Sequence, residues 1–363
     1  MSNNFLNVVH KEKYIGPNTI EISLEKRLEQ LHPKKIDLSL NRIKNLLAKL
    51  NNPQNKIKNI IHIAGTNGKG SVLAFLKAFL KSGNYSVNTY SSPHLLNFNE
   101  RINLNGKNIS NEYLEKILKL CEKKNNDLPI TFFEMTTAAA FIAFKENPAD
   151  YTILETGLGG RLDATNVIKK PIVSIINEIS IDHTNFLGTT LKQIAKEKCG
   201  IIKKNCLVVV GSQSQEVKTI IKKKTEKLKS HTFIYNDDWS VKKDTSLNKI
   251  IYSNNKKNKE TFPLPNLKGN HQVINAGIAI KTIKLIKELN LKNNLIKKGI
   301  KNVEWKGRLQ KIQINTLNLS IDRISKKWEL WFDGGHNKSA SYVLSESLKS
   351  WKNKDLYLIF GML

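Results

Sequence analysis

Apolar positions along the chain follow two alternating patterns. Residues 57–64, IKNIIHIA, end in a continuous apolar run, which is typical of a strand buried on both faces. Residues 71–81, SVLAFLKAFLK, follow closely with apolar side chains at helical spacing. Together the two segments predict a strand, a tight connection and a helix.

Later segments repeat the strand pattern. Residues 151–156, 172–176 and 206–210 are apolar runs bounded by Gly, Pro or Asn. Strands covered on both faces occur mainly in parallel sheets flanked by helices. We therefore predict an α/β fold built on a mostly parallel, helix-flanked sheet.

The polar segment at residues 298–306 predicts a domain junction, and residues 270–289 before it predict a long helix. Beyond the junction the pattern predicts a helix and three strands, at residues 339–351 and at 308–314, 329–332 and 356–360. We expect residues 1–301 to form the main domain and residues 302–363 a smaller Rossmann-like α/β domain. At about 60 residues this second domain is small for a closed core, and we expect it to be incomplete.

Length and composition indicate a soluble globular protein. The 363 residues are 40% hydrophobic and 25% charged, and they are enough for more than one core. No segment reaches the roughly 18 uncharged apolar residues of a membrane span, and the N-terminus lacks a signal-peptide pattern. Cys121, Cys199 and Cys206 form no CxxC pair, which argues against a zinc site or a disulfide framework. We expect a cytoplasmic protein, monomeric and without membrane partners.

The net charge of +28 is the compositional outlier. Such a charge would ordinarily suggest nucleic-acid binding. The lysines are spread over most segments among Asn and Ile, whereas a dedicated binding stripe more often has clustered Arg and exposed aromatics. We therefore favour solvated lysine faces and expect no nucleic-acid partner, although the positive field would attract anionic substrates.

A glycine-rich loop connects the first predicted strand to its helix. Its residues are Gly65, Thr66, Asn67, Gly68, Lys69, Gly70 and Ser71. Small residues let backbone N–H groups approach phosphate oxygens at a helix N-terminus, and the lysine can reach the β and γ phosphates. The match to GxxxxGK[ST] is imperfect, because Ile63 stands at the first Gly position and Gly70 at the Ser/Thr position. The context still predicts a phosphate-binding loop.

Two further clusters lie beyond predicted strands. Residues 155–166, ETGLGGRLDATN, place Glu155 where a carboxylate can meet a metal on the phosphates, because ligands in open α/β sheets bind at the carboxyl ends of strands. Taken alone, this cluster could equally be a turn with a salt bridge. Residues 181–203 contain Asp182, His183 and Lys198, and a lone His or Lys in such a place is usually structural.

These clusters together resemble the folylpolyglutamate synthase and dihydrofolate synthase family, a branch of the Mur ligase superfamily. The motifs that carry the resemblance are residues 37–43, 65–71, 91–95, 98–102, 131–134, 157–166, 197–203, 269–276, 307–308 and 333–337. Any one of them alone is weak, but their occurrence in this order is specific. The resemblance implies a Mur ligase central domain with a P-loop-type sheet and an ATP-dependent acid–amino-acid ligase.

The resemblance also implies a mechanism. A pteroate-type carboxylate attacks the γ-phosphate of ATP to give an acyl phosphate, from which the amine of L-glutamate then displaces phosphate. Lys69 and magnesium would neutralise the transferred phosphate. A first magnesium would bind Ser92 and Glu155, and a second would lie near His183 and a carbamylated Lys198.

Other site residues follow from the same resemblance. It assigns ATP contacts to Asn275 and Arg308, the ribose to Asp333, and a place near the transferred phosphate or the incoming glutamate to His336. The candidates for the pterin side are Asp37, Leu38, Phe133, Glu134 and Arg161. Without the resemblance, Phe133 would more simply be a core aromatic.

The sequence departs from the family pattern where Lys306 and Lys338 replace prolines and Gly335 replaces alanine. Loss of the prolines makes the hinge at Lys306 and the loop at Lys338 less rigid.

Two alternative functions remain: another Mur-type ligase that acts on a cell-wall precursor, and an RNA-binding protein. The motifs GKGS, SSPH and GLGGRLDATN favour the folate branch. The sequence leaves open whether dihydropteroate, tetrahydrofolate or both accept glutamate.

Overall fold

The computed structural model describes residues 37–255, 258–312 and 328–361. Its centre is an eight-stranded sheet with the strand order β4-β3-β2-β5-β1-β6-β7-β8. The strands are β1 (Ile60–Ala64), β2 (Val87–Tyr90), β3 (Ile102–Leu104), β4 (Lys107–Asn108), β5 (Tyr151–Glu155), β6 (Val173–Ile176), β7 (Leu207–Val210) and β8 (His231–Ile234). From β2 to β8 all neighbours pair in parallel, and only β3 and β4 add antiparallel pairs. The predicted mostly parallel sheet is confirmed.

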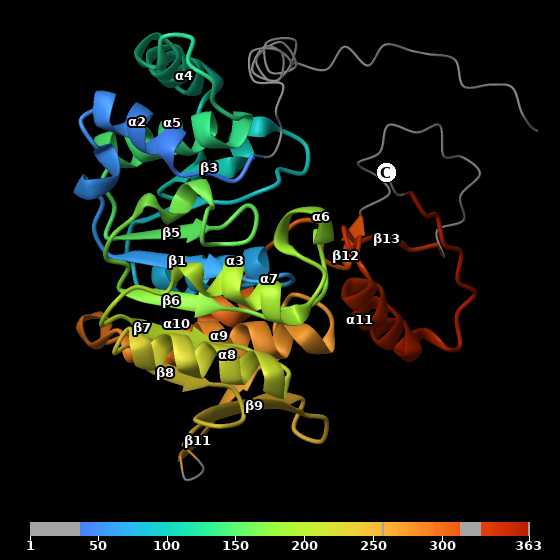
Figure 1. The fold of residues 1–363 in the computed structure, drawn as a ribbon. Helices are drawn as coiled ribbons and strands as arrows, with labels where there is room; N and C mark the ends of the chain where they lie inside the picture. The colour runs from blue at the N-terminus through green and yellow to red at the C-terminus, as the bar shows by residue number, and fades with distance from the viewer. Residues whose placement is uncertain (1–36, 256–257, 313–327, 362–363) are drawn as a thin grey trace, which may run out of the picture.

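Helices cover both faces of this sheet (Figure 1). The α-helices of the described residues are α2 (Asn41–Lys49), α3 (Lys69–Ser82), α4 (Asn111–Asn125), α5 (Phe132–Glu146), α6 (Thr184–Leu187), α7 (Leu191–Lys198), α8 (Gln215–Lys227), α9 (Asn270–Leu285), α10 (Asn293–Asn302) and α11 (Lys338–Leu348), of which α11 lies to the side of the sheet. Short 3-10 helices are Pro53–Lys56, Phe98–Arg101, Ala164–Val167, Cys199–Ile201, Lys287–Leu289 and Lys349–Trp351.

Alternation along the strands separates the core into layers. Ile61 and Ile63 of β1 pack with α3, α9 and α10 on one face. Ile60 points to the other face, where α2, α4 and α5 cover the β2–β5 side of the sheet. The same face near β6 and β7 is covered by α7 and α8. A strand with apolar residues on both sides is what the continuous apolar run predicted.

An antiparallel sheet of three strands packs on α9. It consists of β9 (Trp239–Asp244), β10 (Lys249–Asn254) and β11 (Asn258–Pro263), and Figure 1 shows it projecting beyond β8. Close packing here needs a glycine on the helix, because a Cβ at Gly277 would lie 2.5 Å from Cγ1 of Val241. The sequence patterns did not predict this sheet.

The C-terminal part differs more from its prediction. β12 (Gln310–Ile312) and β13 (Leu330–Phe332) form an antiparallel pair beside α11. The predicted strand at residues 356–360 is wrong: these residues form no strand, and their side chains are between 53% and 93% exposed. A strand needs a neighbour for its backbone hydrogen bonds, and none of the described strands pairs with this segment.

Other boundaries shift by a few residues. The first strand begins at Ile60, after Asn59 with a φ of +48°, rather than at residue 57. Of the predicted strand at 308–314, residues 313 and 314 lie outside the described residues. The domain boundary between residues 301 and 302 stays a prediction. Among the described residues, no helix is both long and apolar enough to cross a bilayer.

Gly299 allows α10 to pack closely on α3, and this packing can be tested. A Cβ at Gly299 would lie 2.6 Å from Cδ1 of Phe79 and 3.1 Å from the carbonyl carbon of Ala78. For Gly299→Ala we expect a lower free energy of unfolding in urea, because overpacking costs about 1–3 kcal/mol and the gain in helix propensity is only about 1 kcal/mol. The exposed neighbour Lys298 gives the control, and Lys298→Ala should change stability by no more than about 0.5 kcal/mol. A Gly299→Ala variant as stable as the wild type would contradict this packing argument.

Candidate active site

The predicted phosphate-binding loop lies between β1 and α3. Gly68 is the N-cap of α3, with a φ of +76°. A Cβ at this position would lie 2.7 Å from Oδ1 of Asn275 and would also meet the amide of Asn177. Only glycine fits both the backbone conformation and the space. The structure thus brings the loop and Asn275 together, as the resemblance implied, and adds Asn177, which donates to Oδ1 of Asn275 at 3.2 Å.

Two lysines meet at one backbone carbonyl of this loop. Nζ of Lys69 donates to the carbonyl oxygens of Gly65 at 3.2 Å and Thr66 at 3.3 Å. Lys198 is the last residue of α7, and its Nζ donates to the same Gly65 oxygen at 2.9 Å. Lys198 is 4% exposed, and burial, followed by the charge of Lys69, lowers its pKa to about 7. The side chain is therefore partly a neutral amine near pH 7.

Glu155 ends β5 beside this loop and is 5% exposed. Burial raises its pKa to about 7, although Lys69, Arg308 and the backbone N–H of Ser92 oppose the shift. A buried carboxylate beside a serine is a suitable oxygen donor set for a hard cation such as Mg²⁺. The residues predicted for the first magnesium therefore lie together.

His183 lies at the N-cap of α6 with a φ of +50°. Burial lowers its pKa, and Lys198, Lys69 and His336 act in the same direction, whereas Asp182 opposes them. His183 is thus close enough to both lysines to feel their charges. No cluster of three or more His, Cys, Asp or Glu side chains suited to a metal occurs in the part of the chain that the structure describes.

The C-terminal segment reaches the same edge of the sheet. Asp333 accepts hydrogen bonds from the backbone N–H groups of Leu309 and Gly335, both at 2.8 Å, and so ties the segment after β13 to the start of β12. The guanidinium of Arg308 donates to the carbonyl of Gly307 at 2.8 Å. His336 is exposed. The ribose contact of Asp333 stays a prediction.

The pterin candidates fall into separate groups. Nε of Arg42 donates to Oε2 of Glu134 at 3.0 Å, and its Nη1 donates to Asp37 at 3.0 Å, so these three side chains form one polar cluster. Phe133 contacts Gly157 in the loop after β5, because a Cβ there would lie 2.5 Å from Cζ of the ring. Phe133 therefore lies near Glu155, as a substrate contact would require.

The remaining two candidates, Leu38 and Arg161, lie apart from these groups. The side chain of Arg161 is 57% exposed and pairs with Glu197 at 2.9 Å, next to Lys198 in sequence. Leu38 packs against the core under α7 and α8. The structure thus places Arg161 beside the end of α7, where it pairs with Glu197.

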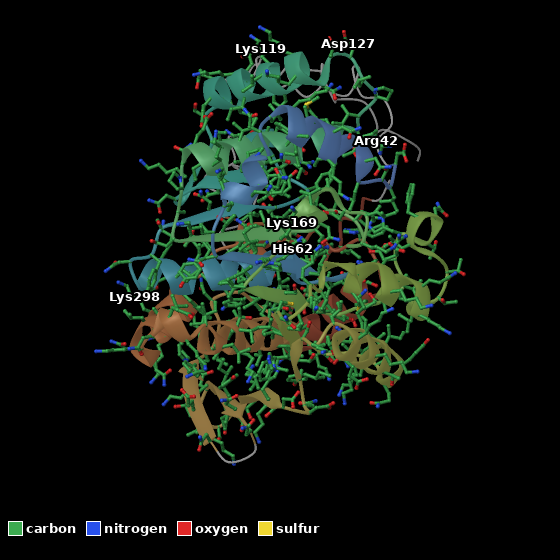
Figure 2. The ribbon with its side chains drawn as sticks, turned by 60° about the vertical axis from the view of Figure 1, so that its left-hand side comes forward. Arg42, His62, Lys119, Asp127, Lys169 and Lys298 are labelled. Carbon is green, nitrogen blue, oxygen red and sulfur yellow. The ribbon has the colours of Figure 1, made fainter. Side chains whose placement is uncertain are left out.

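A buried polar network under the site was not predicted. Asp163 accepts from the backbone N–H groups of Leu158 and Thr165, both at 2.9 Å, and from the Thr165 hydroxyl at 2.5 Å. Nε2 of His62 lies 2.8 Å from the same hydroxyl. Figure 2 shows His62 inside the fold and Lys119 and Lys298 at its periphery. Asp163 belongs to the motif at residues 155–166 that the sequence singled out. His62 lies within an apolar run, and that run did not predict a polar role for it.

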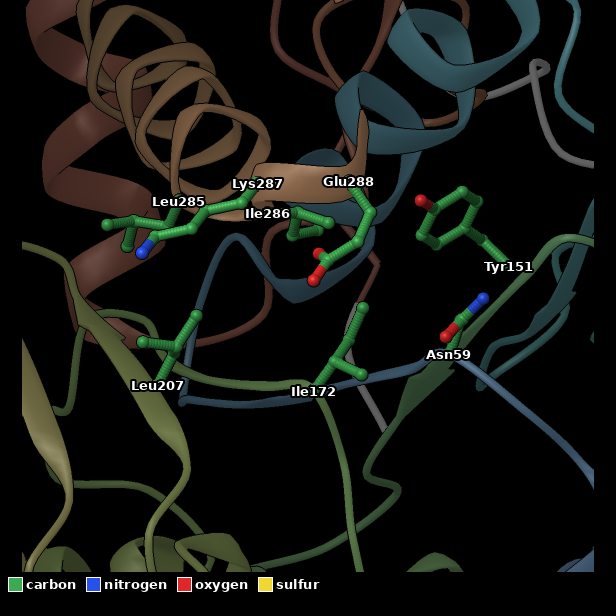
Figure 3. A pocket seen from close by; sticks show the side chains of 8 residues that line it. All are labelled: Asn59, Tyr151, Ile172, Leu207, Leu285, Ile286, Lys287 and Glu288. Atoms are coloured by element: carbon green, nitrogen blue, oxygen red, sulfur yellow. The ribbon is translucent and has the colours of Figure 1, made fainter. Parts of the chain in front are cut away.

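A cavity of about 420 Å³ lies elsewhere, at the amino ends of the parallel strands (Figure 3). Asn59, Tyr151, Ile172 and Leu207, next to or at the starts of strands, line it together with the end of α9. It is at the opposite edge of the sheet from Glu155 and the phosphate-binding loop. Ligands of open α/β sheets bind beyond the carboxyl ends, so this cavity is not the candidate active site.

Comparison with known proteins identifies the family of this chain. Residues 63–283 match the model of the Mur ligase middle domain, so the chain is a Mur-type, ATP-dependent ligase. A dihydrofolate synthase/folylpolyglutamate synthase of Bacillus subtilis is 32% identical over 339 residues, which span 89% of this chain and 75% of the relative. The chain belongs to the dihydrofolate synthase/folylpolyglutamate synthase family.

Solved structures of this family align over nearly the whole chain. E. coli FolC in complex with DHPP and ADP aligns with a TM-score of 0.80 and 29% identity, over 92% of this chain and 75% of that one. A bifunctional folylpolyglutamate synthase/dihydrofolate synthase with Mn, AMPPNP and L-glutamate bound aligns with a TM-score of 0.77 and 29% identity, over 91% and 74%. The predicted fold class is thus confirmed.

The His62 network predicts a dependence of stability on pH. Burial, followed by the charge of Lys203, lowers the pKa of His62 from 6.5 to about 3. A lowered pKa means that the unfolded chain binds the proton more tightly, so this contribution is fully present above pH 6.5 and is lost as the pH falls towards 3. We expect the wild type to lose more unfolding free energy than His62→Gln between pH 6.5 and 4, measured by urea unfolding. Parallel curves for the two proteins would rule out a buried neutral His62.

Proposed function

We propose that this protein joins L-glutamate to dihydropteroate, to tetrahydrofolate or to both, using ATP, in folate synthesis and polyglutamylation. The observation that carries the proposal is the meeting of Lys69, Lys198 and Glu155 at the carboxyl end of the sheet. These groups supply a cation for the phosphates, a partly neutral buried amine and a carboxylate for a metal. The names and bound molecules of the relatives support the choice of substrates.

The proposed reaction has two steps. A carboxylate oxygen of the acceptor attacks the γ-phosphorus of ATP, which gives an acyl phosphate and ADP. The neutral amine of glutamate then attacks the acyl carbon, and phosphate leaves as the amide forms and the amine loses a proton. Lys69 would stabilise the phosphate charge in the first step, because phosphoryl transfer depends mainly on positioning and charge neutralisation. His336 would lie near the transferred phosphate or the incoming glutamate.

The chemistry of the donors fits two magnesium ions. Ser92 and Glu155 would hold the first, and His183 and a carbamylated Lys198 the second; bound magnesium would offset the charge of the phosphates. The carbamate forms when the neutral amine of Lys198 attacks CO₂ and releases one proton. The lowered pKa of Lys198 supports this modification, since only the neutral amine reacts.

We propose the following contacts with ATP and with the pterin substrate. Asn275, which lines the phosphate-binding loop, and Arg308, close enough to Glu155 to affect its pKa, would contact ATP, and Asp333 would contact the ribose. Phe133 would contact the pterin, and its packing against Gly157 in the loop after β5 supports this role. Arg161 would meet the acceptor from the same loop. Asp37, Leu38 and Glu134 would complete the pterin side.

We further propose a monomeric, cytoplasmic enzyme whose partners are small molecules and not nucleic acids. The three cysteines are free and buried, which suits a reducing compartment. Burial raises the pKa of Cys121 and of Cys199 to about 12, so neither is a reactive thiolate. Polyanionic substrates, rather than a macromolecule, would use the positive field.

An acceptor assay tests the proposal. The protein is incubated with ATP, L-glutamate and Mg²⁺, and with dihydropteroate, tetrahydrofolate or a cell-wall precursor in turn. ADP release and product mass are measured. We expect a mass increase of one glutamyl residue with one or both pteridines and none with the cell-wall precursor. A product from the cell-wall precursor alone would refute the folate assignment.

Lys69→Ala should lose nearly all ligase activity while the fold stays intact. The substitution deletes the cation that faces the β and γ phosphates, and we expect kcat to fall by at least about 100-fold. The matched control is Lys81→Ala, an exposed lysine at the other end of α3. Rates are measured at saturating ATP, and circular dichroism verifies the fold. Near-normal turnover of Lys69→Ala would show that this loop is not the nucleotide site.

Lys198→Ala should be inactive and partly rescued by formate or acetate, because a small carboxylate can replace the carbamate oxygens as metal ligands. The exposed Lys196 on the same helix gives the control, and Lys196→Ala should keep its activity without added carboxylate. Native mass spectrometry of the wild type should detect one added carboxyl group. An unmodified Lys198 in an enzyme that is active in CO₂-free buffer would refute carbamylation.

A further inference from the structure

One side chain joins the C-terminal segment to the phosphate-binding loop. Nδ2 of Asn337 donates to Oδ1 of Asn67 at 3.0 Å and to Oδ2 of Asp182 at 3.0 Å. Nδ2 of Asn67 donates back to Oδ1 of Asn337 at 3.4 Å. Asn67 lies in the phosphate-binding loop and Asp182 precedes His183. A single amide thus contacts the two segments that hold Lys69 and His183.

Asn337 also fixes the start of α11. It is the N-cap of this helix, and its Oδ1 accepts from the backbone N–H of Ala340 at 2.9 Å. The same side chain therefore caps the helix and joins its start to the loops that hold Asn67 and Asp182. His336, the preceding residue, is held in the same short segment.

A second contact between these parts has a different partner. The hydroxyl of Ser339 donates to Oε1 of Glu178 at 2.9 Å. Ser339 contacts the side chain of Glu178, whereas the backbone carbonyl of Glu178 accepts from the N–H of Thr66 in the phosphate-binding loop at 2.7 Å. Removing the Ser339 hydroxyl therefore takes away one docking contact of α11 and leaves the Glu178–Thr66 bond and the amide link of Asn337 in place.

We propose that Asn337 is a positioning residue for the ligase reaction. Its amide holds His336 and the start of α11 in register with the phosphate-binding loop and with the Asp182–His183 segment. Misplacement of reacting groups by about 1 Å costs rates on the order of 100-fold, so two hydrogen bonds across this junction matter for turnover. The inference rests on the proposed function.

The chemistry of the amide suggests a reversible test. Asp caps a helix as well as Asn does, but it has no N–H to donate and it would face the carboxylate of Asp182. Asn337→Asp should therefore keep α11 and lose the link. Adding Asp182→Asn exchanges donor and acceptor, because the new amide at 182 can donate to the new carboxylate at 337. Its oxygen can still accept the backbone N–H of His183, which Asp182 binds at 2.8 Å.

The experiment is a double-mutant cycle on the full chain with the acceptor that the wild type uses, measuring kcat and the KM for ATP. We expect Asn337→Asp to lower kcat at least about tenfold, and the exchanged pair to be faster than the product of the two single effects predicts. Asn337→Ser, which also caps but is too short to reach both partners, should be slowed as well. Ser339→Ala should stay within about twofold of the wild type.

Hydrogen exchange of α11 amides gives a readout that does not depend on catalysis. Protection should fall in Asn337→Asp and return in the exchanged pair. Additive effects on kcat, or an Asn337→Asp variant as fast as the wild type, would overturn the proposal. A wild type that ligates no glutamate to either pteridine would refute the proposed function instead, and exchange would then still show whether the link exists.

Discussion

The site depends on the placement of two positive side chains at one carbonyl oxygen. Lys69 arrives from the helix that follows β1, and Lys198 from the end of α7, and both donate to Gly65. Burial is the larger cost of charging Lys198, and repulsion from the ammonium group of Lys69 adds to it. A bound anion at the carboxyl ends of the strands would lower the free-energy cost of charging both lysines. The sheet and its helices hold the two side chains where such an anion can reach them.

Much of this arrangement could be predicted from local signals. The apolar run before Gly65 fixed the strand, the glycines fixed the turn, and Glu155 follows a second run of the same kind. Because parallel strands end at one edge, these residues had to meet. The link between Asn337 and Asn67 could not be predicted, since it depends on how two distant segments dock. The polar role of His62 could not be predicted either, because one buried histidine bonded to Thr165 does not interrupt the apolar pattern of its strand.

The wrong strand at residues 356–360 has a similar cause. An apolar run indicates that the side chains of a segment favour burial, but it does not identify the strand that would pair with its backbone. In the main sheet the neighbours exist, and β1 lies between β5 and β6. Around β12 and β13 the described residues supply only one pair. Leu358 and Ile359 consequently remain 79% and 93% exposed.

The central position of β1 also bears on how the chain is made. Ile61 pairs with Ile153 on one side and with Val173 on the other, both far along the sequence. Contacts of such long range slow folding, because the intervening chain must first lose its freedom. On the ribosome, this apolar strand leaves the exit tunnel long before either partner is synthesised. The nascent protein must therefore stay soluble while a strand of its core has no partner, and exposed apolar segments of this kind favour aggregation.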